Sequence, residues 1–243
     1  MQNRRGLFAG MQSGRLSGFV PYKGTKDLPN AGRISRFIRN FVDMKVALCQ
    51  FSMEWEAAAR NLRRAEELVA QAGADLALLP EMFATGFVTE PWRTALPDEE
   101  ELLAWMRRTA RRYATALAGS AVVRSGDRFA NRFFFVRPAG GAERYDKRHL
   151  FSIGGEDAHF VAGRWRVVVE YGGLRFLPLV CYDLRFPVWC RCRSDYDAIL
   201  CVASWPAPRR EVWRTLLRAR AIENQCYVVG VNRTGDDPWN HYA

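Results

Sequence analysis

The sequence predicts a layered α/β or α+β domain, and three observations lead to this class. From Met44 onwards, short apolar runs of strand length alternate with amphipathic helical patterns, and Gly-containing turns separate several of them. The composition is 49% hydrophobic and 26% charged, which is ordinary for a globular protein. No apolar run approaches the roughly 20 residues that a membrane helix needs, so we expect no membrane partner.

Strands are predicted where β-branched, aromatic and other apolar residues cluster between turn signals. In chain order, these strands are 46–51, 76–79, 120–124, 132–136, 167–171, 174–180, 198–203 and 227–232. Two pairs form predicted hairpins, one across Gly126-Asp127 and one across Gly172-Gly173.

Helices are predicted at 55–72, 99–118 and 209–224, where apolar residues recur every three or four positions. Gly73 directly follows the first of these patterns and is a typical helix stop. Strands with interleaved helices favour layers packed around one core, and we assign this domain to residues 44–243.

The first 43 residues differ from the rest in charge and pattern. They contribute +6 of the formal net charge of +10 and have no sustained helix or strand period. We interpret residues 1–43 as a basic extension that is disordered or non-native, either a targeting arm or, as we prefer, sequence ahead of a true start at Met44. A basic tail without a recognition motif does not indicate a nucleic-acid partner.

The six cysteines lack the regular spacing of a secreted disulfide framework, which favours reduced thiols in a cytoplasmic protein. Cys190 and Cys192 lie near Cys181 and Cys201, but no C-x-x-C pair is present. We therefore expect no metal site.

Three polar residues follow the ends of apolar strands: Glu81, Lys147 and Cys181. Strand ends that open into loops are where α/β sheets place functional groups. Taken singly, each has an ordinary structural interpretation, as a solvated acid, a surface lysine and a small core residue.

The three together would form a cysteine hydrolase site. A thiol with a pKa near 8.5 is mostly protonated at neutral pH, and an ammonium group lowers that pKa while a carboxylate accepts the proton. The thiolate then attacks a carbonyl carbon, the lysine stabilises the oxyanion, and the protonated carboxyl group donates to the departing ammonia.

Three ordered motifs resemble the nitrilase (carbon–nitrogen hydrolase) superfamily: residues 80–87 (PEMFATGF), 145–151 (YDKRHLF) and 179–187 (LVCYDLRFP). Residues 203–209 (ASWPAPR) and 218–225 (RARAIENQ) are similar to its omega-amidase branch, which includes bacterial 2-oxoglutaramate amidases. The resemblance covers the chain from about Met44 to the C-terminus.

The resemblance implies a Glu81–Lys147–Cys181 triad, an α-β-β-α sandwich that dimerises into four layers, and no metal or organic cofactor. It also implies a second carboxylate between the lysine and the cysteine, for which Glu156 is our candidate and Asp157 the alternative. Family members usually continue beyond the position of Ala243, so we expect the last C-terminal strands to be missing.

The branch further implies a small amide substrate, namely the ω-amide of an α-keto dicarboxylic acid. Arg185 suits bidentate binding of its carboxylate, although a structural ion pair with Asp183 is the alternative. Phe87, Trp205 and Tyr182 are candidates for the pocket walls or for plain core. The Tyr182 N–H is a candidate oxyanion donor because it follows the nucleophile.

Other functions remain open. A serine hydrolase is disfavoured because G-x-S-x-G is absent, and a Cys–His protease would have to use His149 as its base. The same triad would also serve a nitrile or N-carbamoyl hydrolase. The alternative that is not an enzyme is a truncated, non-catalytic homologue.

Overall fold

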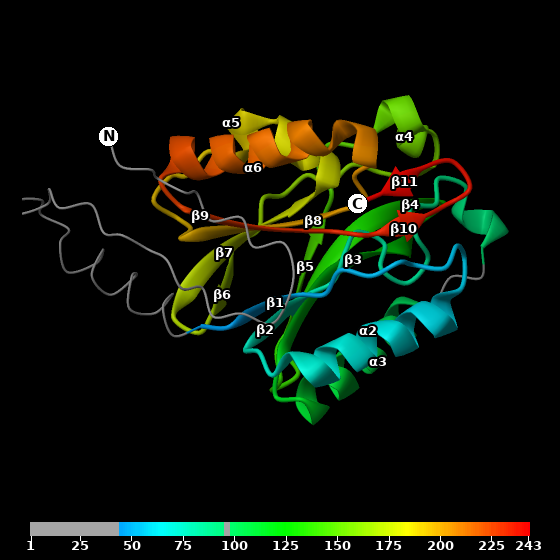
Figure 1. Cartoon of the computed structure of the whole chain (residues 1–243), viewed down its shortest axis with the longest axis horizontal. Coiled ribbons are helices and arrows are strands. Elements are labelled where there is room, and N and C mark those ends of the chain that lie inside the picture. The colour runs from blue at the N-terminus through cyan, green and yellow to red at the C-terminus, as the bar shows by residue number, and fades with distance from the viewer. Residues whose placement is uncertain (1–43, 95–97) are drawn as a thin grey trace, which may run out of the picture.

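The computed structural model of the protein describes residues 44–94 and 98–243. Two β-sheets lie face to face between helical layers (Figure 1). The first sheet has the order β1 (Val46–Leu48), β2 (Leu76–Leu78), β3 (Ala116–Ser125), β4 (Arg128–Val136) and β5 (Ala142–Asp146). The second has the order β6 (Val169–Tyr171), β7 (Leu174–Val180), β8 (Ala198–Ala203) and β9 (Tyr227–Asn232). A short antiparallel pair, β10 (Gly235–Asp236) and β11 (His241–Tyr242), follows.

Helices α2 (Ala58–Ala72) and α3 (Glu99–Arg112) cover the outer face of the first sheet, and α6 (Arg210–Asn224) covers the outer face of the second (Figure 1). Apolar side chains of both sheets fill the space between them. These include Leu76, Leu78, Phe133, Phe135, Phe176, Val180, Leu200 and Val202. Central strands covered on both faces are near-continuous apolar runs, and the predicted α-β-β-α sandwich is confirmed.

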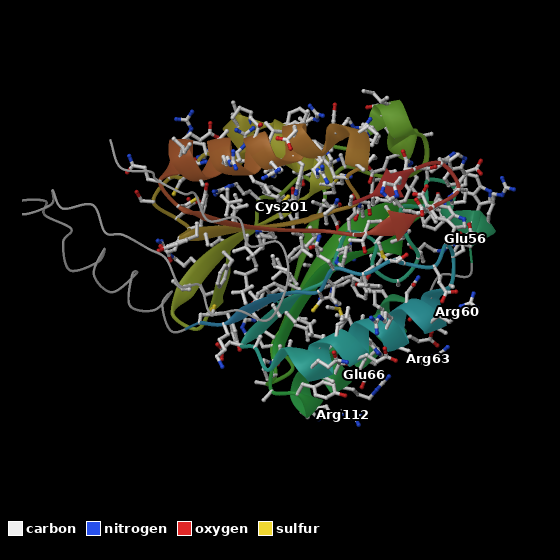
Figure 2. The ribbon with its side chains drawn as sticks, viewed as in Figure 1. Glu56, Arg60, Arg63, Glu66, Arg112 and Cys201 are labelled. Atoms are coloured by element: carbon white, nitrogen blue, oxygen red, sulfur yellow. The ribbon has the colours of Figure 1, made fainter. Side chains whose placement is uncertain are left out.

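The ends of the first two helices follow from local chemistry. Gly73 adopts a left-handed conformation (φ 51°) and ends α2 as predicted. The side chain of Asp98 accepts a hydrogen bond from Glu100 N at 3.1 Å and caps α3. The charged face of α2, with Arg60, Arg63 and Glu66, points away from the sheets, whereas Cys201 lies in the interior (Figure 2).

The predicted helix 99–118 is wrong at its C-terminal end. The helix stops at Arg112, Ala114 takes a left-handed conformation (φ 51°), and β3 begins at Ala116. The residues from Ala116 to Ala118 pair in parallel with β2, so interstrand hydrogen bonds replace the last part of the predicted helix. The alanine- and leucine-rich sequence at this point suits either state, and tertiary pairing decides between them.

Several other boundaries agree with the sequence predictions. Strands β7, β8 and β9 have the predicted bounds, and both predicted hairpins are present. Strand β4 is longer than predicted because its pairing with β3 continues up to the Gly126-Asp127 turn. Strand β3 is longer mainly because it begins at Ala116, where it pairs with β2. The short helices α4 (Glu156–His159) and α5 (Pro187–Cys190) were not predicted.

Four strands direct their carboxyl ends to the same edge of the sandwich. Glu81 lies just beyond β2, Lys147 follows β5, Cys181 follows β7 and Ser204 follows β8. Parallel pairing of β7 with β8, and the register of the first sheet, bring these ends together. The fold therefore gathers polar residues from four distant stretches of sequence.

No helix in the two described ranges is both long and apolar enough to cross a membrane. The predictions made for residues 1–43 fall outside the described part of the chain.

Candidate active site

Cys181 occupies a constrained turn at the end of β7. Its backbone has φ 47°, a conformation that costs a non-glycine residue roughly 1–3 kcal/mol. Such a conformation persists only where the surrounding structure imposes it. The carboxylate of Asp183 holds this turn by accepting hydrogen bonds from Val180 N at 3.1 Å and His149 N at 2.9 Å. The turn thus lifts the thiol out of the strand and towards the pocket.

His149 supports the turn and does not face the pocket. Its Nδ1 lies 2.8 Å from Asp183 Oδ1, and its ring stacks on Phe186 with 3.6 Å between centroids. This placement argues against His149 as the base of a Cys–His site.

Lys147 lies between two buried carboxylates. Its Nζ is 2.9 Å from Glu81 Oε1 and 2.8 Å from Glu156 Oε2, and all three side chains are fully buried. The predicted alternative to Glu156, Asp157, is exposed. Of the two acids, only Glu156 therefore reaches the lysine.

Asn131 is a member of this cluster that the sequence analysis missed. Its Nδ2 donates to Glu81 Oε1 at 2.8 Å and to Glu156 Oε1 at 3.0 Å, so the two carboxylates share two donors, Asn131 and Lys147. Its Oδ1 is buried without a hydrogen-bond partner, which is the orientation two carboxylates impose on an amide. Asn131 shares one face of β4 with Phe129 and Phe133, and a polar residue between these two apolar positions was the available signal.

Ser204 was also missed. Its backbone N–H donates to Glu81 Oε2 at 2.9 Å, and its Oγ donates to Glu81 O at 3.2 Å. Ser204 directly follows β8, which is the same strand-end signal that singled out the three predicted residues. Together with Asn131 and Lys147, it fixes both oxygens of Glu81.

The charges of the cluster set its protonation. Burial disfavours the cation on Lys147, but the carboxylates of Glu156 and Glu81 outweigh this effect, and the pKa of Lys147 is raised. Burial raises the pKa of Glu156, although Lys147 opposes that shift. Burial and the negative charge of Glu81 hold the pKa of the Cys181 thiol well above its usual value, against the opposing effect of Lys147.

We expect the thiol of the resting enzyme to react as a high-pKa group. Its rate of modification by methyl methanethiosulfonate, a small neutral reagent, should rise about tenfold per pH unit from pH 6 to pH 9 without a plateau, because only the thiolate reacts. Mass spectrometry of the Cys181 peptide across this range measures the rate. A plateau below pH 8 would contradict a neutral resting thiol.

A cavity of about 330 Å³ opens beside Cys181 and Lys147. The four predicted substrate-binding residues, Phe87, Tyr182, Arg185 and Trp205, all line it. Further lining residues are Thr89, Phe151, Ser204, Pro206, Arg209, Asp237, Trp239 and Tyr242. The cavity suits a small molecule with both apolar and polar parts.

Arg185 does not form the ion pair with Asp183 that was its alternative role. The Asp183 carboxylate is occupied by Tyr145 Oη and by the His149 and Val180 contacts. The Arg185 guanidinium instead lies over the Trp205 ring, 5.0 Å from its centroid. No ion pair of Arg185 occurs within residues 44–94 and 98–243.

The described residues contain no group of three or more His, Cys, Asp or Glu side chains arranged to hold a metal ion. Of the two neighbouring cysteines considered above, Cys190 donates to Asp183 O at 3.7 Å and Cys192 to Tyr196 O at 3.5 Å.

Comparison with known proteins identifies the family. The carbon-nitrogen hydrolase family matches residues 45–242. Omega-amidase YafV of Yersinia enterocolitica is 48% identical over 82% of this chain and 78% of that protein. The 2-oxoglutaramate amidase of Bacillus subtilis is 33% identical over 82% and 79%.

Solved structures agree. XC1258 from Xanthomonas campestris, a CN-hydrolase superfamily protein with an arsenic adduct in its active site, superposes with a TM-score of 0.79 at 42% identity, covering 82% of this chain and 80% of that one. An amidase from Nesterenkonia sp. AN1, modified by acrylamide at its active-site cysteine, gives 0.75 at 26% identity over 82% of each. The predicted resemblance is confirmed: the chain belongs to the carbon-nitrogen hydrolase family, on its omega-amidase branch.

Proposed function

We propose that this chain hydrolyses the ω-amide of an α-keto dicarboxylic acid, such as 2-oxoglutaramate, to the diacid and ammonia through a thioester at Cys181. The observation that carries the proposal is one pocket that combines a thiol, a lysine held between two carboxylates and an arginine without an ion-pair partner. The similarity to an omega-amidase and to a 2-oxoglutaramate amidase supports the same substrate class.

In the first half-reaction, Glu81 takes the thiol proton as Cys181 Sγ attacks the amide carbon. The carbonyl oxygen becomes an oxyanion, and we assign its stabilisation to the Lys147 ammonium and the Tyr182 N–H. The tetrahedral intermediate then collapses, the C–N bond breaks, and Glu81 returns its proton to the leaving nitrogen. Ammonia departs and the thioester remains.

In the second half-reaction, water replaces ammonia. Glu81 accepts a proton from the water as its oxygen attacks the thioester carbon, and Lys147 again stabilises the oxyanion. The C–S bond then breaks, and the Cys181 thiolate regains a proton from Glu81. The free acid leaves and the site returns to its starting state.

Glu81 and Glu156 are suited to different roles. Glu156 accepts hydrogen bonds from Lys147, Asn131 and Phe151 N, so both of its oxygens are held by protein donors. Glu81 acts on the Cys181 thiol through its negative charge, which raises the pKa of that thiol. We therefore assign proton transfer to Glu81, and to Glu156 the positioning of the ammonium group.

A substrate panel tests the proposal. We expect ammonia release from 2-oxoglutaramate to exceed that from nitriles, N-carbamoyl amines and neutral amides by at least about 100-fold in kcat/KM, since the latter lack the group that Arg185 would bind. A coupled assay for ammonia measures all four classes. Faster turnover of nitriles or carbamoyl compounds would favour the alternative hydrolase, and no turnover of any class would favour a non-catalytic homologue.

We also propose that the protein acts as a homodimer in the cytoplasm. Two large apolar side chains, Val188 on α5 and Ile222 on α6, are 80% and 77% exposed and would be covered in a subunit interface. Six cysteines without a disulfide in the described chain fit a reducing compartment. Sedimentation analysis at micromolar concentration should give twice the chain mass, and a monomer would contradict the assembly.

A further inference from the structure

A second arginine stands at the same pocket. Arg209 lines the cavity from the turn that precedes α6, and its guanidinium lies over the Phe151 ring, 5.6 Å from the centroid. In the sequence, Arg209 is the last residue of the motif at 203–209, and no role was predicted for it. Its side chain, like that of Arg185, is exposed at the rim of the cavity.

The two arginines belong to one ring of contacts around the opening. Phe151 packs on Tyr182 with 5.2 Å between centroids, and Arg185 lies 5.8 Å from the Tyr182 centroid. Arg185 also lies over Trp205, and Trp205 Nε1 donates to Arg209 O at 2.9 Å. Aromatic rings thus lie within cation–π distance of both guanidinium groups on the cavity wall. No side-chain hydrogen bond from either guanidinium group occurs within the described ranges, so their N–H donors are available to a ligand.

Neither cation is neutralised by protein. Within the described ranges, no carboxylate lies within ion-pair distance of Arg185 or Arg209. The one acid among the described lining residues is Asp237, and its oxygens already accept from Trp239 N at 2.9 Å, Asn240 N at 2.7 Å and Tyr242 Oη at 2.5 Å. Asp237 Oδ2 also lies 3.9 Å from Arg233 Nη1, so its negative charge is paired with a cation of the protein. The opening therefore presents two unpaired positive charges and no unpaired negative charge among its described lining residues.

This charge pattern selects one class of ligand. A carboxylate gains charge-assisted hydrogen bonds from two guanidinium groups, and an adjacent keto oxygen can accept a further N–H. An α-ammonium group at the same place would meet two like charges without an available carboxylate. The opening suits an α-keto acid rather than an α-amino acid.

We propose that Arg209 and Arg185 together form a carboxylate subsite at the mouth of the pocket, and that Arg209 is a specificity-determining residue for amides with a distal carboxylate. This inference rests on the proposed amidase function and adds a second residue that binds the distal carboxylate of the substrate. The amide carbon of the same substrate has to reach Cys181 Sγ, which lines the same cavity.

The test compares Arg209→Leu with Arg210→Leu. Arg210 is the next residue, is exposed and is not among those that line the cavity, so it is a matched control for charge and for position near the start of α6. For 2-oxoglutaramate, Arg209→Leu should lower kcat/KM about 10- to 100-fold, mainly through KM, because a charge-assisted contact is lost. For a neutral amide such as butyramide, kcat/KM of Arg209→Leu should stay within about threefold of the wild-type value. Arg210→Leu should leave kcat/KM unchanged for both substrates.

Two further variants sharpen the result. Arg209→Lys keeps the charge and should retain part of the preference for the anionic substrate. The double variant Arg185→Leu/Arg209→Leu should lose less than the product of the two single losses if both residues bind one carboxylate.

The possible outcomes distinguish failure of the carboxylate subsite from failure of the proposed amidase function. Equal losses on anionic and neutral amides, or an unchanged KM for 2-oxoglutaramate in Arg209→Leu, would overturn the subsite while leaving the amidase proposal intact. A wild-type enzyme without any preference for the anionic amide would overturn the proposed function itself.

Discussion

Replacing Cys181 with alanine is expected to abolish ammonia release, with a fall in kcat of about 10⁴-fold or more. Loss of the nucleophile removes the covalent route, and the remaining groups of a catalytic set retain only a small part of the rate enhancement. Steady-state assays of ammonia release measure the effect. Mass spectrometry of the wild-type enzyme during turnover should also find an acyl adduct on the Cys181 peptide.

A matched control is available at Cys226. This thiol is half-buried, lies outside the cavity and has a pKa that burial raises to about 12. Cys226→Ala should keep at least about half of the activity, because the same substitution is made away from the cavity and from the groups that act on the substrate. Substantial turnover by Cys181→Ala, or an adduct on another cysteine, would refute the proposed nucleophile.

Replacing Lys147 with methionine is expected to cost about 3–5 kcal/mol of unfolding free energy as well as activity. The change keeps the length of the side chain but leaves Glu81 and Glu156 buried without their shared cation. Chemical denaturation followed by fluorescence measures the loss. The same substitution at Arg144, whose ion pairs with Glu99 and Glu100 are partly exposed, should cost less than about 1 kcal/mol.

The pH dependence of Lys147→Met provides a second check. Without the ammonium group, which opposes the effect of burial, the pKa of the Glu156 carboxyl group rises further above its value in the unfolded chain. Groups whose folded pKa is raised favour the folded state at low pH and lose that contribution as the pH rises. The deficit relative to wild type should therefore be smaller at pH 5 than at pH 8.

A double variant separates stability from catalysis. Lys147→Met/Glu156→Gln removes one of the two unpaired charges and should regain part of the lost stability without regaining activity. Equal stability of Lys147→Met and wild type at pH 8 would contradict the assignment of Lys147 as the cation that holds the cluster together.

Local patterns in the sequence were sufficient for most elements and for the family. Apolar runs and Gly turns located β7, β8 and β9 with their bounds, and strand-end polar residues singled out Glu81, Lys147 and Cys181. These features can be predicted from the sequence because strand periodicity, turn chemistry and motif spacing depend on residues close together in the chain. The helix that was predicted to run to Ala118 marks the limit of this reasoning, since its end depends on pairing with β2.

The partners of each polar group came only from the tertiary structure. Glu81 accepts from Ser204, 123 positions away, and from Lys147, 66 positions away, while Asn131 joins it to Glu156. The choice of Glu156 over Asp157, the free guanidinium of Arg185 and the place of Arg209 at the same opening likewise depend on strand order and register. Such contacts join segments whose separation in the chain carries no periodic signal, so the folded sheets alone decide which charges meet and which remain free to bind a substrate.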